Sequence, residues 1–294
     1  MFEHVRWDRA KNSKISSPLA IYRYVSQDSK MDILSLFSEK GGVGKTTATV
    51  GLARALASRG LNVGVVDLDP RSTATIWLGV EVRPGEHVGA ILGTDDVAGA
   101  AQDLAHSTPW HPNITVIPGH RDVAALEGAP QEYGDVRLRN AIAGWDRDVV
   151  LIDAPNRQGG FLIRTALTAS TRVLYTTTPD EDGRSGVEWA RSNVARFRQL
   201  SPLNPDVQEA GVIVTRWPDN IPSRDALGAL AALREDNEGM VLAPLIPERV
   251  IVRSARAGEV WWGDYERGAP VAAAFEDLAG QLWPVTDETT RSNA

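Results

Sequence analysis

The chain has 294 residues, 43% of them hydrophobic, and a formal net charge of -7 at pH 7. This length and composition suffice for a large domain with a sizeable buried core, whereas the acidic balance argues against a protein that coats nucleic acid with its whole surface. The absence of cysteine excludes disulfides, iron–sulfur clusters and thiolate zinc sites.

Two segments at the ends of the chain differ from the rest. Residues 1–30 are polar and have no clear periodicity, so we predict a flexible or loosely docked arm. Residues 286–294 are expected to form a frayed polar tail, which leaves 31–285 as the folded domain. No apolar run is long enough to cross a membrane, and the first residues lack the apolar stretch of a secretory signal. We therefore expect a cytoplasmic protein.

From residue 31 onward, short apolar runs alternate with segments of helical periodicity. Apolar strands joined by helices are what a parallel sheet covered on both faces requires. The predicted fold is therefore α/β, with a doubly wound, mostly parallel central sheet and helices on both faces. Strands are expected at 33–38, 63–67, 114–117, 149–152, 173–177, 212–215 and 241–245. Helices are expected at 46–58, closed by Gly60, and near 135–143, 160–169, 184–200, 224–235 and 271–283.

The loop between the first predicted strand and the first predicted helix has the sequence SEKGGVGKTT at 38–47. Its glycines allow backbone N–H groups to turn toward phosphate oxygens, and the helix N-terminus adds its dipole at the same point. In this arrangement Lys45 reaches the β- and γ-phosphates and the Thr46 hydroxyl ligates Mg²⁺. The motif favours a P-loop NTPase over the alternative of a tight turn without a ligand. The expected nucleotide-binding residues are Lys40, Gly41, Gly42, Val43, Gly44, Lys45, Thr46 and Thr47.

Three carboxylates follow two of the predicted strands. Asp67 and Asp69 are spaced i and i+2 at the end of the second strand, so both side chains leave the same side of an extended segment. At the C-terminal edge of a parallel sheet, that side faces the crevice where ligands bind. Asp153 ends the apolar strand at 149–152 in the form of a Walker B segment, and we expect it to hold Mg²⁺ through water. The alternative for Asp67 and Asp69 is that they only cap a turn.

These motifs resemble those of a known family. The sequence KGGVGKTT at 40–47 is similar to the deviant Walker A box of the ParA/MinD family of ATPases, with Glu39 where the strict phosphate loop has glycine. The resemblance continues with DLDP at 67–70 and, in part, with IPERV at 246–250. The departures from the family pattern are Arg71 in place of glutamine and Asn156 in place of a second proline.

The resemblance implies roles for individual residues. It implies that Lys40 crosses the interface of an ATP-sandwiched dimer and contacts the partner's phosphates. It also implies that Asp69 positions the attacking water and that Asp67 supports the Mg²⁺ shell or the adjacent loop. Lys40, Lys45 and Asp69 are therefore the expected catalytic residues, and Thr46, Asp67 and Asp153 the expected metal-site residues. Contacts to the base are expected at Thr215, Arg216 and Pro247.

The function implied by the resemblance is that of a short ParA or Soj-type partition ATPase. Such a protein forms an ATP-dependent homodimer, binds nonspecific DNA on the nucleoid, and releases it after hydrolysis stimulated by a ParB-like centromere-binding protein. The arginines that best match the family's DNA contacts are Arg224, Arg249 and Arg253, and the alternative for each is a solvated surface arginine. Binding built on such contacts should weaken as salt rises.

Three other functions are possible on the same scaffold. A membrane-positioned relative of the MinD kind needs a basic amphipathic C-terminal helix, but 271–283 carries Glu276 and Asp277, so no membrane partner is expected. A metabolic ATP-dependent enzyme and a cargo-positioning ATPase of the same family both remain as alternatives.

Overall fold

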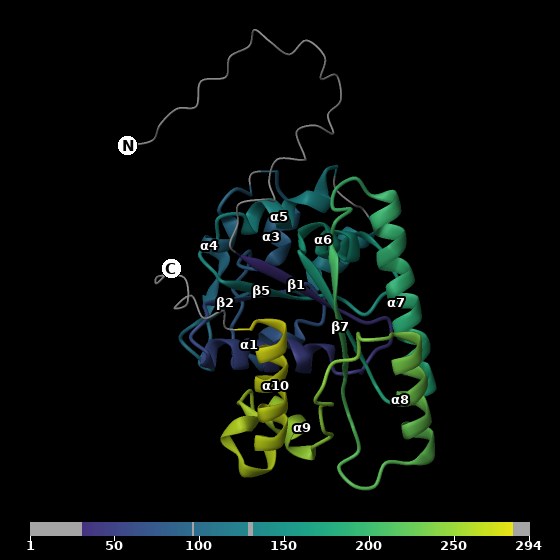
Figure 1. Cartoon of the computed structure of the whole chain (residues 1–294). Coiled ribbons are helices and arrows are strands. Elements are labelled where there is room, and N and C mark those ends of the chain that lie inside the picture. The colour runs from purple at the N-terminus through teal and green to yellow at the C-terminus, as the bar shows by residue number, and fades with distance from the viewer. Residues whose placement is uncertain (1–30, 96, 129–131, 285–294) are drawn as a thin grey trace, which may run out of the picture.

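The computed structural model describes residues 31–95, 97–128 and 132–284. The arm at 1–30 and the tail at 286–294, predicted from sequence, thus lie outside the described residues. Within the described part, one sheet has the strand order β3-β4-β2-β5-β1-β6-β7 (Figure 1). Its strands are parallel apart from the β3–β4 pair, which confirms the predicted α/β fold. The strands are β1 Asp32–Phe37, β2 Val63–Asp67, β3 His106–Ser107, β4 Ile114–Ile117, β5 Val149–Asp153, β6 Arg172–Thr177 and β7 Gln208–Val214.

Helices cover both faces of the sheet (Figure 1). The α-helices are α1 Lys45–Ser58, α2 Thr73–Trp77, α3 Val88–Leu92, α4 Ala100–Leu104, α5 Arg137–Ile142, α6 Phe161–Ala169, α7 Glu181–Leu200, α8 Arg224–Asp236, α9 Val250–Ala257 and α10 Ala269–Leu282. The 3-10 helices are η3 Arg121–Glu127, η4 Gly134–Val136, η5 Trp262–Asp264 and η6 Glu266–Gly268. None of the helices in the described ranges is long and apolar enough to span a bilayer.

Alternation of side chains along the strands creates two separate apolar cores. Leu34 of β1 and Val65 of β2 face one core, which they share with α1, α2, α9 and α10. Ile33 and Val66, their neighbours in sequence, face the other core, which is closed by α3 to α8. Every residue of β2 and β5 is buried, as expected for central strands covered on both faces. The sheet therefore presents only its edges and strand ends to ligands.

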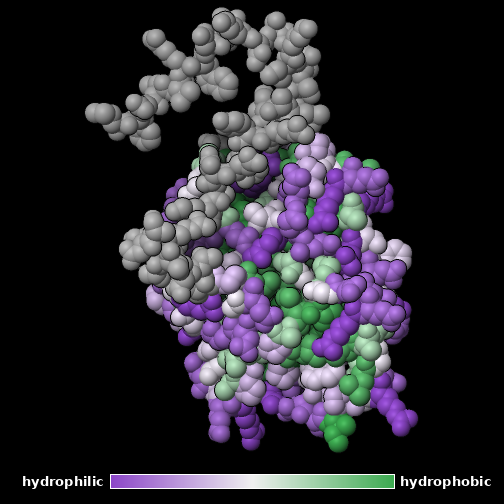
Figure 2. All heavy atoms as spheres, viewed as in Figure 1, coloured by the Kyte–Doolittle hydropathy of each residue, from purple (hydrophilic) through white to green (hydrophobic). Residues whose placement is uncertain are grey.

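The predicted strand at 241–245 is wrong. This segment lies alongside β7. The N–H groups of Leu242 and Ile246 donate to the carbonyls of Val212 and Val214, at 2.9 Å each. Within the described residues, however, the only β-bridge that the segment makes is Val212–Val241. Pro244 interrupts the ladder because it has no N–H to donate. The segment still shields the edge strand, and Figure 2 shows hydrophobic side chains gathered there inside a hydrophilic rim.

Two glycines allow the helices and the sheet to approach closely. A Cβ on Gly51 of α1 would lie 2.5 Å from the Phe275 ring of α10, and a Cβ on Gly64 of β2 would lie 2.5 Å from the Trp145 ring. Real Cβ atoms do not come this close, so neither site has room for a methyl group without repacking. Gly60, with φ 88°, follows the end of α1 as predicted.

We expect Gly51→Ala to lower the free energy of unfolding, by about 1–3 kcal/mol, because the new methyl group overpacks the contact between α1 and α10. Gly228→Ala in α8 is the matched control, since a Cβ there meets no atom within 4 Å. The control should instead gain up to about 1 kcal/mol from helix propensity. Urea denaturation of both variants measures the difference, and equal stability would contradict the packing argument.

Candidate active site

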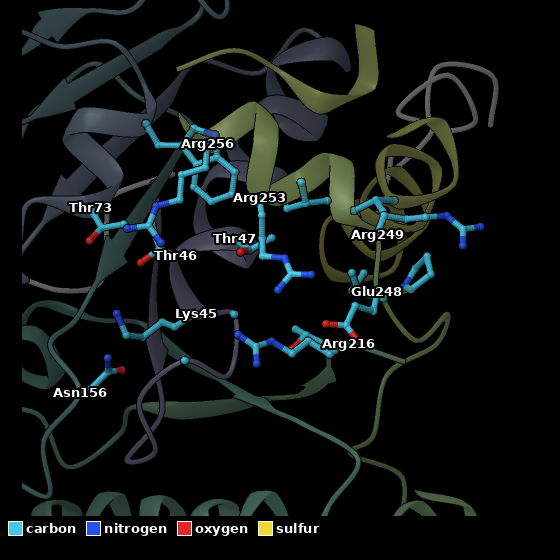
Figure 3. Close-up of a pocket in the computed structure, with 18 of the residues that line it drawn as sticks. Lys45, Thr46, Thr47, Thr73, Asn156, Arg216, Glu248, Arg249, Arg253 and Arg256 are labelled. Atoms are coloured by element: carbon cyan, nitrogen blue, oxygen red, sulfur yellow. The ribbon is translucent and has the colours of Figure 1, made fainter. Parts of the chain in front are cut away.

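A pocket of about 300 Å³ opens at the carboxyl ends of the central parallel strands (Figure 3). Its walls come from the loop after β1, the segment after β2, the segment after β7, and α9. Because all these segments follow parallel strands or lie beside them, the topology brings them to one edge of the sheet. This edge is where the sequence places its phosphate loop and its carboxylates.

The phosphate loop needs its glycines for both conformation and space. Gly42 and Gly44 have φ angles of 80° and 82°, in the region that side chains avoid. A Cβ on Gly44 would also lie 2.9 Å from Oγ1 of Thr215, a hydroxyl that donates a 2.7 Å hydrogen bond to the Val43 carbonyl. α1 begins at Lys45, so its unpaired N–H groups face the pocket and suit an anion.

Lys45, Thr46 and Asp153 form a buried polar cluster behind the loop. Lys45 Nζ and Thr46 Oγ1 each donate a 2.7 Å hydrogen bond to Asp153, one to each carboxylate oxygen. Thr49 Oγ1 adds a 3.2 Å hydrogen bond to the same carboxylate. A hydroxyl beside a carboxylate is a donor set that suits a hard cation such as Mg²⁺, and an adjacent ammonium suits a phosphate. The residues present therefore fit a magnesium-bound nucleotide.

Asp67 and Asp69 occupy different environments. Asp67 is fully buried behind the pocket wall and accepts hydrogen bonds from the Thr75 N–H at 2.9 Å and the Thr75 hydroxyl at 2.8 Å. Burial first, and then the nearby carboxylate of Asp153, raise the pKa of Asp67 above its usual range. Asp69 lines the pocket, and its carboxylate accepts a 3.0 Å hydrogen bond from the Arg71 N–H. Of the two carboxylates, only that of Asp69 lines the pocket.

Thr75 links Asp67 to a second loop. Its hydroxyl accepts a 2.8 Å hydrogen bond from the Gly119 N–H while it donates to Asp67. A Cβ on Gly119 would lie 2.8 Å from the carboxyl carbon of Asp67, so the loop after β4 packs directly against this carboxylate. Asp67 thereby fixes the start of α2 and the loop after β4, which is consistent with support of the adjacent loop.

Lys40 lies on the rim and is turned away from the pocket of its own chain. Its Nζ makes ion pairs with Asp180 at 3.0 Å and Asp182 at 3.3 Å, at the start of α7. Partial burial lowers the pKa of Lys40, but hydrogen bonds to these two carboxylates outweigh it, so the pKa is raised. Neighbouring Glu39 accepts a hydrogen bond from Asn193 of α7. Contacts with α7 thus hold Glu39 and Lys40, at the start of the loop. The carboxylate at the end of β5 holds Lys45 and Thr46, at its end.

The residues expected near the base lie together on the far wall of the pocket. Thr215, Arg216 and Pro247 all line it. Their segments are joined by backbone hydrogen bonds, from the Trp217 N–H to Ile246 at 2.9 Å and from the Glu248 N–H to Trp217 at 2.7 Å. These three positions thus lie together at the pocket, and their contact with the base stays a prediction.

The arginines predicted to contact DNA do not form one group. Arg224 is exposed at the start of α8, outside the pocket. Arg249 also lines the pocket, but it is paired with Asp219, and Figure 3 shows its side chain turned away from those of Arg253 and Arg256. Arg253 of α9 is instead directed into the pocket (Figure 3). Arg71, Asn156 and Arg256 line the pocket but were not among the site residues predicted from the sequence. For Arg256, the signal that could have identified it is its i, i+3 spacing from Arg253 on a helix.

Comparison with known proteins identifies the family. Residues 31–208 match a family model described as an AAA domain. The sporulation initiation inhibitor protein Soj of Bacillus subtilis is 32% identical over 259 residues, which cover 85% of this chain and 97% of Soj. The chain belongs to the ParA/MinD family of P-loop ATPases. The chromosome-partitioning ATPase Soj of Thermus thermophilus is a further relative of this ParA/MinD-family protein, 29% identical over 86% of this chain and 96% of its own length.

Solved structures agree with the fold of this ParA/MinD-family protein. An ATP complex of a McdA variant from Cyanothece superposes with a TM-score of 0.75 at 23% identity and covers 86% of this chain and 97% of that one. Cobyrinic acid a,c-diamide synthase from Mycobacterium smegmatis, with bound ADP and magnesium, gives a TM-score of 0.67 at 26% identity and covers 85% and 92%. The same fold therefore occurs in proteins with different names.

We expect Thr75→Val in this ParA/MinD-family protein to lower the free energy of unfolding by about 1–3 kcal/mol, because the Gly119 N–H loses its acceptor and buried Asp67 loses a donor. Thr75→Ser keeps the hydroxyl and should recover most of the loss. Urea denaturation at fixed pH compares the three proteins. If Thr75→Val unfolds at the same urea concentration as the parent chain, the hydroxyl does not hold these two loops together.

Proposed function

We propose that this chain is a partition-type ATPase that dimerises with ATP and Mg²⁺, binds nonspecific DNA, and releases it after hydrolysis. The observation that carries the proposal is that the two lysines of the loop lie in different places. Lys45 is buried against Asp153 inside the pocket, whereas Lys40 lies on the rim and contacts no group in its own pocket. A second cation held at the rim is suited to the phosphates of a second copy.

In the proposed mechanism, each of the pocket residues has a separate role in binding or hydrolysing the nucleotide. The loop N–H groups and Lys45 bind the phosphates, and Thr46 and Asp153 hold Mg²⁺, which neutralises phosphate charge when bound. Asp69 orients the attacking water, because its carboxylate lines the pocket while the Arg71 N–H fixes one of its oxygens. Asp67 holds the loops around it rather than the nucleotide.

Lys40 can leave its present partners at low cost. Its side chain is 35% exposed, and the partner carboxylates of Asp180 and Asp182 are 50% and 83% exposed. Exposed ion pairs of this kind contribute about 0–1 kcal/mol each, because water and salt screen them. Lys40 is therefore available to contact the phosphates bound by a second copy, as in the homodimer that we propose.

The names of the relatives support a role in partition. The two Soj proteins are named for chromosome partitioning and for inhibition of sporulation initiation. On the basis of this likeness we propose a role on the nucleoid, with a ParB-like protein as the stimulating partner. Among the arginines predicted to contact DNA, exposed Arg224 fits that role best, because Arg249 is paired and Arg253 faces the pocket.

A metabolic ATP-dependent enzyme is the second candidate. Its support is the likeness to cobyrinic acid a,c-diamide synthase, at 26% identity over 85% of this chain. An enzyme of this kind would use the same phosphate loop but would need no DNA. DNA binding therefore separates the two candidates.

The test is co-sedimentation with nonspecific duplex DNA in the presence of ATP, ADP or no nucleotide, across a series of salt concentrations. Binding that needs ATP and weakens steeply with salt is the expected result, because phosphate contacts release counterions. If the chain binds ATP but no DNA in any nucleotide state, the partition proposal is wrong and the metabolic candidate gains.

We predict that Asp69→Ala still binds ATP but hydrolyses it at least about 100-fold more slowly, because the water loses its positioning carboxylate. Phosphate release and nucleotide binding are measured on the same preparation. Asp135→Ala is a matched control, since that carboxylate pairs with Arg164 and does not line the pocket. Turnover by Asp69→Ala at the rate of the parent chain would remove Asp69 from the mechanism.

We predict that Lys40→Ala binds ATP with the affinity of the parent chain yet does not form the ATP-dependent dimer. The reason is that Lys40 makes no contact in its own pocket, so its loss affects only the second copy. Analytical ultracentrifugation with ATP measures dimerisation, and equilibrium dialysis measures binding. A normal dimer from Lys40→Ala would show that the rim lysine has no role across the interface.

A further inference from the structure

Helix α9 brings two arginines to the wall of the pocket that faces the phosphate loop. Figure 3 shows the side chains of Arg253 and Arg256 directed into the pocket, and Arg256 extends toward the side where Thr46 and Thr73 lie. Arg216, from the segment after β7, points into the same space. Figure 3 thus shows the side chains of Arg253 and Arg256 across from the loop, whereas the guanidinium group of Arg216 lies next to the loop, 3.8 Å from the position of a Cβ on Gly42.

These arginines have no protein partner. Among the described residues, the side chains of Arg253 and Arg256 make no hydrogen bond and no ion pair. Several other arginines of the fold are paired with a carboxylate, as Arg172 is with Asp32 and Arg191 with Glu209. An arginine without a carboxylate that projects into a pocket is suited to a phosphate, which its planar fork can bind at two oxygens.

The charge of the pocket is also unbalanced. Six cationic side chains line it, against the two carboxylates of Asp69 and Glu248. Lys45 is neutralised by Asp153 and Arg249 by Asp219, so the excess rests on the remaining four arginines. Like charges gathered around one space repel each other, and an anion in that space relieves the repulsion. The cations that line the pocket are Lys45, Arg71, Arg216, Arg249, Arg253 and Arg256.

α9 is attached to the fold by few buried contacts. Ala255 is its only buried residue, and Val250 at its start is 69% exposed. A helix with so little burial draws little stability from the core, so contacts to a ligand can account for much of its order. α9 is therefore the wall of the pocket that is most able to respond to a ligand.

We propose that Arg253 and Arg256 bind the phosphate groups of the nucleotide from the side opposite Lys45, so that the nucleotide holds α9 against the phosphate loop. The inference rests on the proposed nucleotide binding and adds a phosphate-binding arm to it. It also reassigns Arg253, since a side chain engaged with the nucleotide is not free to contact DNA.

The first test is nucleotide affinity, measured by isothermal titration calorimetry with Mg²⁺ and either ATP or ADP. Arg253→Ala and Arg256→Ala are each expected to weaken binding by about 10-fold, the loss of one charge-assisted hydrogen bond. Arg234→Ala, an exposed arginine of α8 outside the pocket, is the matched control and should bind as the parent chain does. Thermal denaturation confirms that each variant is folded.

The second test is hydrogen–deuterium exchange over 250–257. ADP or ATP should slow exchange in this segment of the parent chain, and the Arg253→Ala/Arg256→Ala double variant should lose that protection even when nucleotide is saturating. Unchanged affinity together with unchanged protection in the double variant would overturn the inference. A parent chain that binds neither nucleotide would instead overturn the proposed function, and the inference with it.

DNA binding distinguishes the two roles of Arg253. With ATP at saturation, Arg253→Ala should bind nonspecific DNA with the salt dependence of the parent chain. If the slope of log affinity against log salt falls by about 1, Arg253 contacts a DNA phosphate directly and the reassignment is wrong.

Discussion

The buried ion pair between Lys45 and Asp153 is the interaction on which the site depends. It joins the start of α1 to the end of β5, two segments that are 108 residues apart in sequence. Both groups are almost completely buried, and Thr46 and Thr49 provide further donors to the carboxylate. Removing one partner of such a pair leaves an uncompensated buried charge, which costs about 3–5 kcal/mol. The phosphate loop is therefore held in place by the protein itself.

Further hydrogen bonds connect the region around this ion pair to the other walls of the pocket. Asp67, paired with Asp153 in the β2–β5 register, accepts hydrogen bonds from Thr75, and the Thr75 hydroxyl accepts one from the Gly119 N–H. On the other side, Thr215 binds the Val43 carbonyl and joins the end of β7 to the phosphate loop. Every wall of the pocket except α9 is thus connected to the sheet by buried hydrogen bonds. Buried hydrogen bonds thus hold the walls next to the sheet, whereas the α9 wall has a single buried residue.

The sequence predicted the parts of the site that depend on local geometry. The glycines of the phosphate loop, and the carboxylates that end β2 and β5, follow apolar runs whose pattern indicates buried strands. Once the strands are parallel, their ends must meet at one edge, so Asp67, Asp153 and Lys45 could be placed together. The spacing of Asp67 and Asp69 predicted that both side chains face the crevice, and this is wrong for Asp67. β2 ends at Asp67, whose side chain is fully buried, so of the two only Asp69 lines the pocket.

Some parts of the site were not predicted from the sequence. No helix was predicted at α9, because its eight residues are shorter than the window in which helical periodicity is recognised. Of its two arginines, Arg253 was expected on a DNA surface and Arg256 was not identified. The segment at 241–245 has the apolar composition of a strand, but a single proline interrupts its pairing with β7. The partners of Lys40 lie 140 and 142 residues away, at the start of a helix that only the full topology brings beside the loop.

The position of Lys40 has a consequence for any association through the rim. Asp180 and Asp182 already neutralise its charge, so a contact with an outside anion replaces existing pairs and does not add to them. In the proposed homodimer, the carboxylates at the start of α7 would therefore compete for Lys40 with the phosphates bound by the second copy.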